Sequence, residues 1–394
     1  MNAQVFPVLM VTREHAGDRR YGLGRSLLPV VEALQRKGWP VRYLCQEDLP
    51  DLSKVARARW LRLLGRLPGI KGAAHRSLIL GALAERLQMG WFAAQTARND
   101  GFKCVYLHDP WLACGFWLGI KAMRLGGVRW GVAEHGFGCY SRATHEDGLV
   151  QGPWIQRRLR RIEAAVLSQA HWVTAPTELS LDQLARDLAL PFNPGHWRSI
   201  PHAAAQMVLP SRDHARRELG WNESDFYVLG VGRLAPLKRF DVLVDAWIGL
   251  ARRNSSLHLQ LLGGGDVQSL QRMADAAGLG ECIHFAVVED VQPYLAAADV
   301  YVSTSATESF GLANLEALVA GLPCICTAVG GVPEVMGQGA WLIPVEPRAL
   351  ESALGELISQ PAQRKAWSAR ATAQARRAVN IEAVSDQYAE LFSK

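Results

Sequence analysis

Short apolar runs alternate with helix-like segments along almost the whole chain, and this alternation constrains the fold more than any other feature. The runs predicted to be strands cover residues 5–12, 40–45, 104–107 and 131–133 in the first half, and 227–230, 258–262, 283–286, 300–303 and 324–327 in the second. Strands that are joined through helices pair in parallel, with helices on both faces of the sheet. Because the pattern occurs twice, the sequence predicts an α/β protein with two facing Rossmann-like domains.

Composition and connectivity indicate where these domains begin and end. The chain has 394 residues, of which 49% are hydrophobic and 20% charged, and this is enough for two full cores. We expect a first domain over residues 1–205, a second over 206–375, and a terminal helix within 376–394.

Membrane spans and disulfides are not indicated. No apolar run reaches the roughly 18 residues of a span, and residues 1–12 lack a basic region before their apolar stretch. We therefore expect a cytoplasmic protein. The seven cysteines show no paired spacing, which favours reduced thiols. Cys324 and Cys326 share a predicted strand without a second pair of ligands, so we interpret them as core and predict no metal site.

Two glutamates stand eight residues apart near the end of the chain, Glu308 in a loop and Glu316 inside a helix predicted over residues 311–320. One face of this helix carries, at the spacing of a buried stripe, Leu312, Leu315, Glu316 and Val319. Glu316 thus occupies a position where leucine is expected. A buried carboxylate needs donors or cations around it, which ribose hydroxyls, a neighbouring arginine or backbone N–H groups could supply.

A second motif follows the predicted strand at residues 227–230. There Gly232 and Arg233 come directly after the strand, and Lys238 follows five residues later, before another helix. Ligands collect at strand ends of α/β sheets, and cations at a helix start oppose the helix dipole unless an anion binds there. The alternative is a pair of solvated surface cations.

In these motifs the chain resembles the retaining glycosyltransferases of family 4, whose E-x7-E signature matches Glu308 and Glu316. The resemblance implies a GT-B fold whose last helix packs back on the first domain. It also implies that Glu308 lies beside the donor sugar, that Glu316 binds the ribose, and that Arg233 and Lys238 hold the diphosphate. It further implies that the backbone of Phe310, Gly311 and Leu312 faces the sugar and diphosphate, and that Gly232 also contributes to donor binding.

The resemblance is thinner in the first half of the chain. It implies a donor-binding glycine loop at Gly22 and Gly24, an acceptor-side pair at His108 and Asp109, and a histidine, His135, that contacts the sugar. A histidine at a strand end can equally be structural. Where relatives carry I-P-N-G-V-D, this chain has I-P-H-A-A-A at residues 200–205, so His202 could face the cleft or pack at the hinge.

Charge is divided unevenly between the two halves. Residues 1–200 hold 27 Lys and Arg against 16 Asp and Glu, whereas residues 201–394 hold 16 against 21. The stretch 52–84 has no acidic residue, and a second basic cluster covers residues 157–161. The candidate contacts in this stretch for an anionic membrane surface or an acidic acceptor are Arg57, Arg59, Arg62 and Arg66. Solvated helical faces are the alternative, and the lack of a nucleic-acid-binding module argues against nucleic acid.

The resemblance and these features together predict a retaining glycosyltransferase whose donor is a nucleotide sugar, UDP- or GDP-linked. The predicted acceptor is a glycan, a lipid-linked sugar or a glycolipid in the biosynthesis of a cell-surface glycan. We expect the protein on the cytoplasmic side of the membrane, with an anionic membrane surface as a possible partner. No Asp-x-Asp occurs in the sequence, so we expect no cofactor and no metal-bridged diphosphate. The alternatives are a GT-B sugar-nucleotide epimerase, a glycoside phosphorylase, or a catalytically silent binding subunit of the same fold.

Overall fold

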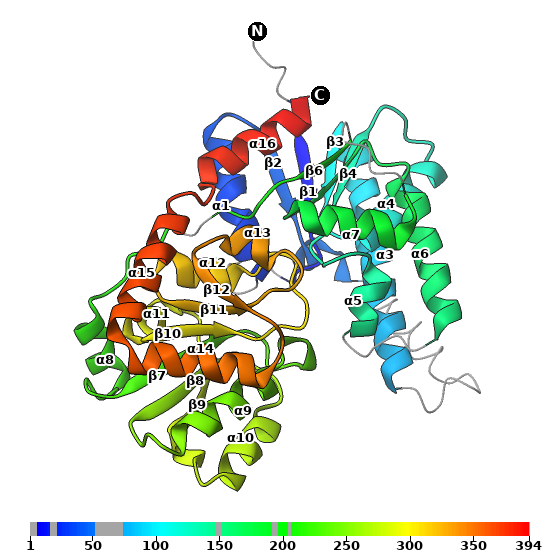
Figure 1. Ribbon diagram of the computed structural model, residues 1–394. Helices are drawn as coiled ribbons and strands as arrows, with labels where there is room; N and C mark the ends of the chain where they lie inside the picture. The colour runs from blue at the N-terminus through cyan, green and yellow to red at the C-terminus, as the bar shows by residue number, and fades with distance from the viewer. Residues whose placement is uncertain are drawn as a thin grey trace. The chain divides into compact units, whose positions relative to one another are not determined.

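A computed structural model (Figure 1) describes residues 6–15, 22–51, 74–146, 152–190, 196–203 and 206–393. The chain forms two compact units, the first comprising Met1–Ala203 and Ile381–Lys394, and the second Ala204–Asn380. Four arginines that the sequence singled out lie outside the described residues, namely Arg57, Arg59, Arg62 and Arg66.

The first unit is built on a parallel six-stranded sheet of order β2-β1-β3-β4-β5-β6. Its strands are β1 (Val8–Val11), β2 (Val41–Leu44), β3 (Cys104–Leu107), β4 (Arg129–Ala133), β5 (Trp172–Ala175) and β6 (Trp197–Ser199). Its α-helices are α1 (Gly22–Arg36), α3 (Ala74–Asp100), α4 (Pro110–Ala122), α5 (Tyr140–Glu146), α6 (Pro153–Leu167), α7 (Glu178–Leu188) and α16 (Ile381–Ser393), with a short 3₁₀ turn η1 (Gln46–Asp48).

The second unit carries a parallel six-stranded sheet of order β12-β11-β10-β7-β8-β9. Its strands are β7 (Phe226–Val231), β8 (Leu257–Leu262), β9 (Ile283–Ala286), β10 (Val300–Ser303), β11 (Cys324–Thr327) and β12 (Ala340–Ile343). Its α-helices are α8 (Arg212–Leu219), α9 (Phe240–Ala251), α10 (Val267–Ala276), α11 (Gln292–Ala297), α12 (Leu312–Val319), α13 (Val332–Met336), α14 (Pro347–Ser359) and α15 (Pro361–Ala375), with 3₁₀ turns η2 (Pro236–Lys238) and η3 (Gly280–Cys282). The predicted α/β class is confirmed in both units.

Three strands were not predicted from the sequence: β5, β6 and β12. The predicted strands β1 and β3 also have four residues, so length is not the reason that these three, with three or four residues each, were missed. They complete their sheets by pairing with strands already in place, which is a tertiary effect.

The donor-binding role of Gly22 and Gly24 stays a prediction, but the predicted loop at these residues was wrong, because helix α1 begins at Gly22. Both glycines lie in its first turn. The side chain of Glu14, after β1, accepts a hydrogen bond from the Leu23 backbone N–H at 3.1 Å. This contact from a distant residue satisfies an otherwise free N–H at the helix start.

The last helix, α16, packs within the first unit against α1 (Figure 1). Lys37, just after α1, donates to Ser385 Oγ at 2.7 Å, and Arg36 NH2 lies 2.9 Å from Glu382 Oε1. Phe392 is fully buried and contacts Trp39 edge-on. The end of the chain therefore completes the core of the unit with which the chain begins.

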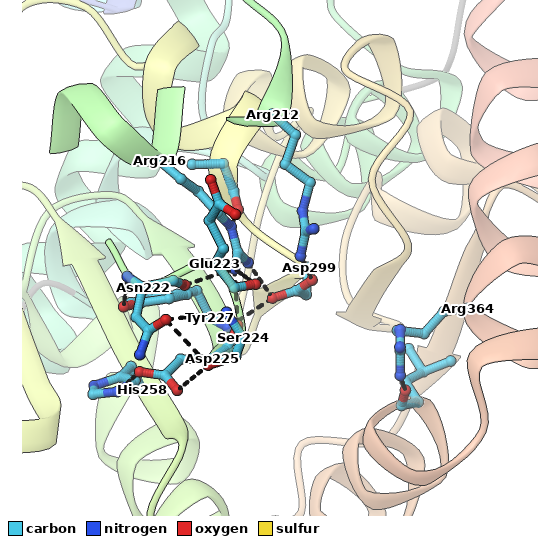
Figure 2. Close-up of polar contacts among 12 residues, drawn as sticks. Arg212, Arg216, Asn222, Glu223, Ser224, Asp225, Tyr227, His258, Asp299 and Arg364 are labelled. Carbon is cyan, nitrogen blue, oxygen red and sulfur yellow. Dashed lines mark hydrogen bonds and ion pairs between the residues drawn. The ribbon is translucent and has the colours of Figure 1, made fainter. Parts of the chain in front are cut away.

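A buried arginine organises the start of the second unit. Arg216 of α8 is 0% exposed, and its guanidinium donates to the backbone carbonyls of Asn222, Glu223 and Asp225, each at 2.9 Å. The same group reaches Asp299 Oδ2 at 2.7 Å, as Figure 2 shows. One side chain thus connects the loop before β7 to the residue that precedes β10.

Candidate functional site

The second unit has a topological switch point between β7 and β10. From β7 the chain builds β8 and β9 on one side and then returns to add β10, β11 and β12 on the other. In open α/β sheets, ligands bind outside the carboxyl ends of the strands at such a point. The loops that follow β7 and β10 are therefore the first place to look for a site.

The structure brings together two predicted site residues from these loops. Lys238, the last residue of η2, forms an ion pair with the Glu308 carboxylate, and both side chains are largely buried. Backbone contacts hold the loops together, because the Ala306 N–H donates to Leu237 O at 2.8 Å and Thr304 Oγ1 donates to Lys238 O at 3.0 Å. A cation and a carboxylate thus lie in contact at the switch point.

Glu308 is positioned by a third loop that the sequence analysis did not single out. After β11, the Gly331 N–H donates to Glu308 O at 2.8 Å. Gly330 has φ +54°, and a Cβ at this position would lie 2.0 Å from the same oxygen. Only glycine permits this approach. The signal available in the sequence was the Gly330-Gly331 pair, which begins three residues after a predicted strand.

Gly232 and Arg233 lie at the end of β7. Gly232 has φ +153°. The loop after β8 passes close to the Gly232 backbone, because a Cβ added to Gly263 in that loop would lie 2.0 Å from Gly232 O. Arg233 is exposed and forms no ion pair with any described residue. A Cβ added to Gly232 would lie 3.5 Å from Lys238 Cε, so the end of β7 lies beside Lys238, and the next residue along the chain, Arg233, is exposed.

Helix α12 contains the second glutamate, and its predicted burial is confirmed, since Glu316 is 8% exposed. Gly311 is the N-cap residue with φ +80°, and no side chain caps the helix, so the first-turn N–H groups are available to an anion. Phe310, next to the cap, is buried, and Leu312 opens the helix. Asn314 accepts a bond from the Tyr301 hydroxyl at 2.8 Å, while its amide Nδ2 is buried and has no hydrogen-bond partner among the described residues.

In the first unit, His108 and Asp109 follow β3, and both are buried. Asp109 Oδ1 caps α4 by accepting the N–H groups of Trp111 and Leu112 at 2.7 and 3.3 Å, and Asp109 Oδ2 accepts from Arg86 Nε at 2.9 Å. Asp109 thus has a structural role, and its predicted acceptor-side role stays a prediction.

Three histidines meet at the carboxyl edge of the same sheet. His108 Nδ1 lies 3.1 Å from His135 Nε2, and the two rings stack with centroids 5.3 Å apart. His202, after β6, stacks with His135 at 5.5 Å. Burial lowers the pKa of His108 to about 3 and that of His202 to about 4. It lowers the pKa of His135 well below its usual value, with the neighbouring histidines contributing. All three rings are therefore neutral at pH 7.

Glu134 is a buried carboxyl that the sequence analysis did not assign to the site. Its Oε1 accepts the Gly136 N–H at 2.9 Å, and its Oε2 is buried without a partner in the part of the chain that the structure describes. Burial raises the pKa of Glu134 to about 7, and the charge of Asp109 adds to this rise. A second buried carboxyl, Glu163 of α6, has its pKa raised well above the usual value by burial and by Glu134.

Within the described ranges, no cluster of three or more His, Cys, Asp or Glu side chains is arranged to hold a metal ion. Cys324 and Cys326 are buried in the core of the second unit.

Comparison with known families identifies the class of protein. Residues 21–201 match the family described as "Glycosyl transferase 4-like domain", and residues 211–374 match "Glycosyl transferases group 1". Together with two parallel Rossmann-like sheets, these matches define the GT-B glycosyltransferase class. The chain belongs to the family 4 type of these glycosyltransferases, as its E-x7-E motif indicated.

The most similar curated relatives include D-inositol 3-phosphate glycosyltransferases. That of Actinosynnema mirum is 29% identical over 376 residues, which cover 90% of this chain and 88% of the relative. That of Streptomyces griseus is 28% identical over 292 residues, covering 66% and 62%. The chain spans about three fifths of the length of the relatives from Streptomyces griseus and Rhodococcus opacus.

Solved structures confirm the GT-B fold. Sucrose-phosphate synthase from Thermosynechococcus elongatus superposes with a TM-score of 0.73 at 21% identity, with 98% of both chains covered. WaaG, a glycosyltransferase involved in lipopolysaccharide biosynthesis, gives 0.71 at 17% identity, covering 98% of this chain and 99% of WaaG. At these identities the likeness concerns the fold alone.

Proposed function

We propose that this protein transfers a sugar from a nucleoside-diphosphate sugar, UDP- or GDP-linked, to an acceptor, with retention of anomeric configuration and without a metal ion. The observation that carries the proposal is the Lys238–Glu308 ion pair at the switch point of the second sheet. A cation placed there can neutralise a leaving diphosphate, and a carboxylate beside it can receive sugar hydroxyls.

The charged residues of the two motifs in the second unit, together with His135, have defined roles in this proposal. Arg233, Lys238 and the uncapped start of α12 stabilise the diphosphate as negative charge develops on it. Glu316 binds the ribose, and Glu308 contacts the donor sugar. The departing phosphate takes the acceptor proton, so no side-chain nucleophile is needed. His135 contacts the sugar, and its backbone carbonyl stabilises the developing positive charge.

We assign the acceptor to the first unit and the nucleotide sugar to the second. The proposed acceptor is a glycan, a lipid-linked sugar or a glycolipid in the assembly of a cell-surface polysaccharide, at the cytoplasmic face of the membrane. The excess of basic residues in the first half favours an anionic acceptor. Because the curated relatives are named for D-inositol 3-phosphate, a phosphorylated polyol is the second candidate.

The diphosphate site is tested by Lys238→Ala and Arg233→Ala, with Lys365→Ala, an exposed residue of α15, as the control. We expect each site variant to lower kcat by roughly 10²- to 10³-fold, the effect of removing one preorganised charge, and the control to leave it unchanged. Nucleotide-sugar turnover with an added acceptor is measured. Rates within about threefold of wild type would place the diphosphate elsewhere.

Substrate class and metal dependence are tested on the wild-type protein. A thermal-shift screen with UDP, GDP and their sugars identifies the base, because saturation to 100 times Kd stabilises by about 2.7 kcal/mol. Transfer should survive EDTA. Isomerisation of the free nucleotide sugar would indicate an epimerase, and sugar phosphate formed from glycan and phosphate would indicate a phosphorylase. Neither binding nor turnover would indicate a silent subunit.

A further inference from the structure

Asn314 of α12 carries a buried polar group that the proposed function does not use. It is the third residue of the helix, and helical side chains lean back toward the N-terminus. Its amide nitrogen therefore lies at the N-cap, where a Cβ added to Gly311 would be 2.6 Å from Asn314 Nδ2. Asn314 is 2% exposed, and Nδ2 has no hydrogen-bond partner among the described residues. Buried donors without an acceptor are uncommon, so this one is expected to gain an acceptor in another state of the site.

Tyr301 fixes the orientation of this amide. The Tyr301 hydroxyl donates to Asn314 Oδ1 at 2.8 Å, and burial raises the pKa of Tyr301 well above its usual value. The hydroxyl therefore keeps its proton and needs an acceptor, which the amide nitrogen cannot be. Oδ1 thus faces Tyr301, and Nδ2 faces the N-cap. The charges of Glu308 and Glu316 add to the raised pKa of Tyr301, so the Tyr301–Asn314 pair lies close to both motif glutamates.

Glu308 approaches the same point at the N-cap. A Cβ added to Gly311 would lie 3.3 Å from Glu308 Cγ, on the side where it also meets Asn314 Nδ2. In this structure the Glu308 carboxylate is bound to Lys238, and its side chain is 16% exposed. The Glu308 carboxylate is therefore an anionic acceptor close to Nδ2, and its present partner is the cation that the proposed function assigns to the diphosphate.

We infer that Asn314 is a positioning residue that takes over the Glu308 carboxylate when Lys238 turns to the diphosphate of the nucleotide sugar. This inference rests on the proposed function, which assigns Lys238 to the diphosphate and Glu308 to the sugar. A diphosphate carries more negative charge than a carboxylate, so it attracts the ammonium and repels Glu308. A largely buried carboxylate that loses its cation needs a donor. Asn314 Nδ2 is a donor that needs an acceptor, so one exchange satisfies both groups and keeps Glu308 beside the sugar.

The test is calorimetric titration of the full chain, wild type and Asn314→Leu, with UDP, UMP, GDP and GMP. In the proposed reaction, charge develops on the phosphate next to the sugar, which the diphosphates keep and the monophosphates lack. Leucine keeps the branched shape of asparagine and removes the donor. We expect Asn314→Leu to bind the diphosphate roughly 10- to 100-fold more weakly, the scale of a lost hydrogen bond to a charged group. Affinity for the monophosphate should be unchanged, because it does not draw Lys238 away from Glu308.

Tyr301→Phe is the matched control, because it removes the hydroxyl that orients Asn314 and keeps Nδ2. It should weaken diphosphate binding less than Asn314→Leu does. Adding Asn314→Leu to Lys238→Ala should have little further effect, since no ion pair is left to exchange. If Asn314→Leu does not fold, Asn314→Ala gives the same comparison.

Two results would overturn the exchange alone. One is equal diphosphate affinity in wild type and in a folded Asn314 variant. The other is an equal loss of affinity for diphosphate and monophosphate, which a merely structural role of Asn314 would produce. A wild-type protein that binds none of the four nucleotides would overturn the proposed function, and this inference with it.

Discussion

Individual residues of the candidate site combine exposed charge with buried charge. Arg233 is exposed at a strand end, whereas Glu316 and Glu134 are buried carboxyls. Periodicity in the sequence identified Glu316 as buried, because it replaces an apolar residue within a helical stripe. Glu134 gave no such signal, because it directly follows a short strand and is buried by contacts from other elements.

The raised pKa of Glu134 predicts a pH-dependent contribution to stability. Between its ordinary value of 4.5 and about 7, the folded state keeps a proton that the unfolded state has lost. Stability contributed by this group is therefore lost as pH rises, by roughly 1.4 kcal/mol per pH unit in that window. We expect Glu134→Gln to gain stability relative to wild type between pH 5 and pH 8, measured as the difference in Tm.

The control for this prediction is Glu47→Gln, at an exposed position of the same unit. It removes an exposed carboxylate from the same unit, and its Tm is measured over the same pH range, so that the effect of Glu134 is read as the difference between the two variants. A Glu134→Gln curve parallel to that of wild type from pH 5 to pH 8 would mean that Glu134 titrates at its ordinary pKa.

At the scale of elements, the site is built by loops that follow parallel strands and bind one another. The loop after β10 is held by backbone bonds from the loops after β7 and β11. Such contacts join residues that are far apart in the chain, so they depend on the strand order and on close backbone approach. Glycine is required where two backbones come nearest.

Gly330→Ala tests this dependence. The added Cβ would meet Glu308 O at 2.0 Å, so the loop that carries Glu308 must move, and we expect kcat to fall by roughly 10²-fold. Gly220→Ala is the matched control, because Gly220 also has positive φ but no atom lies within 4 Å of the added Cβ. It should lose only about 1–2 kcal/mol of stability to backbone strain and keep its activity. Equal kcat in both variants would exclude a positioning role for Gly330.

The Arg216 network predicts a stability effect at the start of the second unit. Arg216→Met leaves four backbone carbonyls, including that of Ala297, and the Asp299 carboxylate without their shared partner, and we expect it to cost about 3–5 kcal/mol. Arg212→Met removes the second arginine that reaches the same carboxylate (Figure 2). The Arg212 side chain is 47% exposed, so its loss should cost less than about 1 kcal/mol. Denaturant unfolding measures both. Similar losses in the two variants would contradict a structural role for Arg216.

At the scale of the whole molecule, basic residues outnumber acidic ones only in the first half, and six of the eight exposed large hydrophobic side chains among the described residues lie there too. Helix α6 exposes Trp154 (60%) and Ile162 (41%), and Arg158 and Arg161 on the same helix are exposed. Arginine together with exposed tryptophan and isoleucine is typical of helices that lie on anionic membranes. None of the described helices is long and apolar enough to span a bilayer.

We therefore expect the protein to sediment with anionic liposomes at low salt and to be released as salt shortens the screening length to about 8 Å. Two variants should weaken this binding. In the first, Trp154, Arg158, Arg161 and Ile162 are replaced by serine. In the second, Arg57, Arg59, Arg62 and Arg66 are replaced by serine. Replacing Arg252 and Arg253, exposed in the second unit, is the control.

Binding to neutral and anionic vesicles alike would rule out an electrostatic membrane surface. Binding that only the second variant weakens would assign the surface to the basic stretch and exclude α6.

The sequence by itself determined the α/β class, the twofold repetition of strand and helix, the burial of Glu316 and the family. These features are local: apolar runs, helical periodicity and short motifs depend on residues close together in the chain. Tertiary structure alone decided that Lys238 meets Glu308, that Gly330 supports Glu308, and that His108 bonds to His135. Those pairs join residues on different loops, and which loops meet depends on strand order. Strand order is set by the packing of whole elements, which no local pattern encodes.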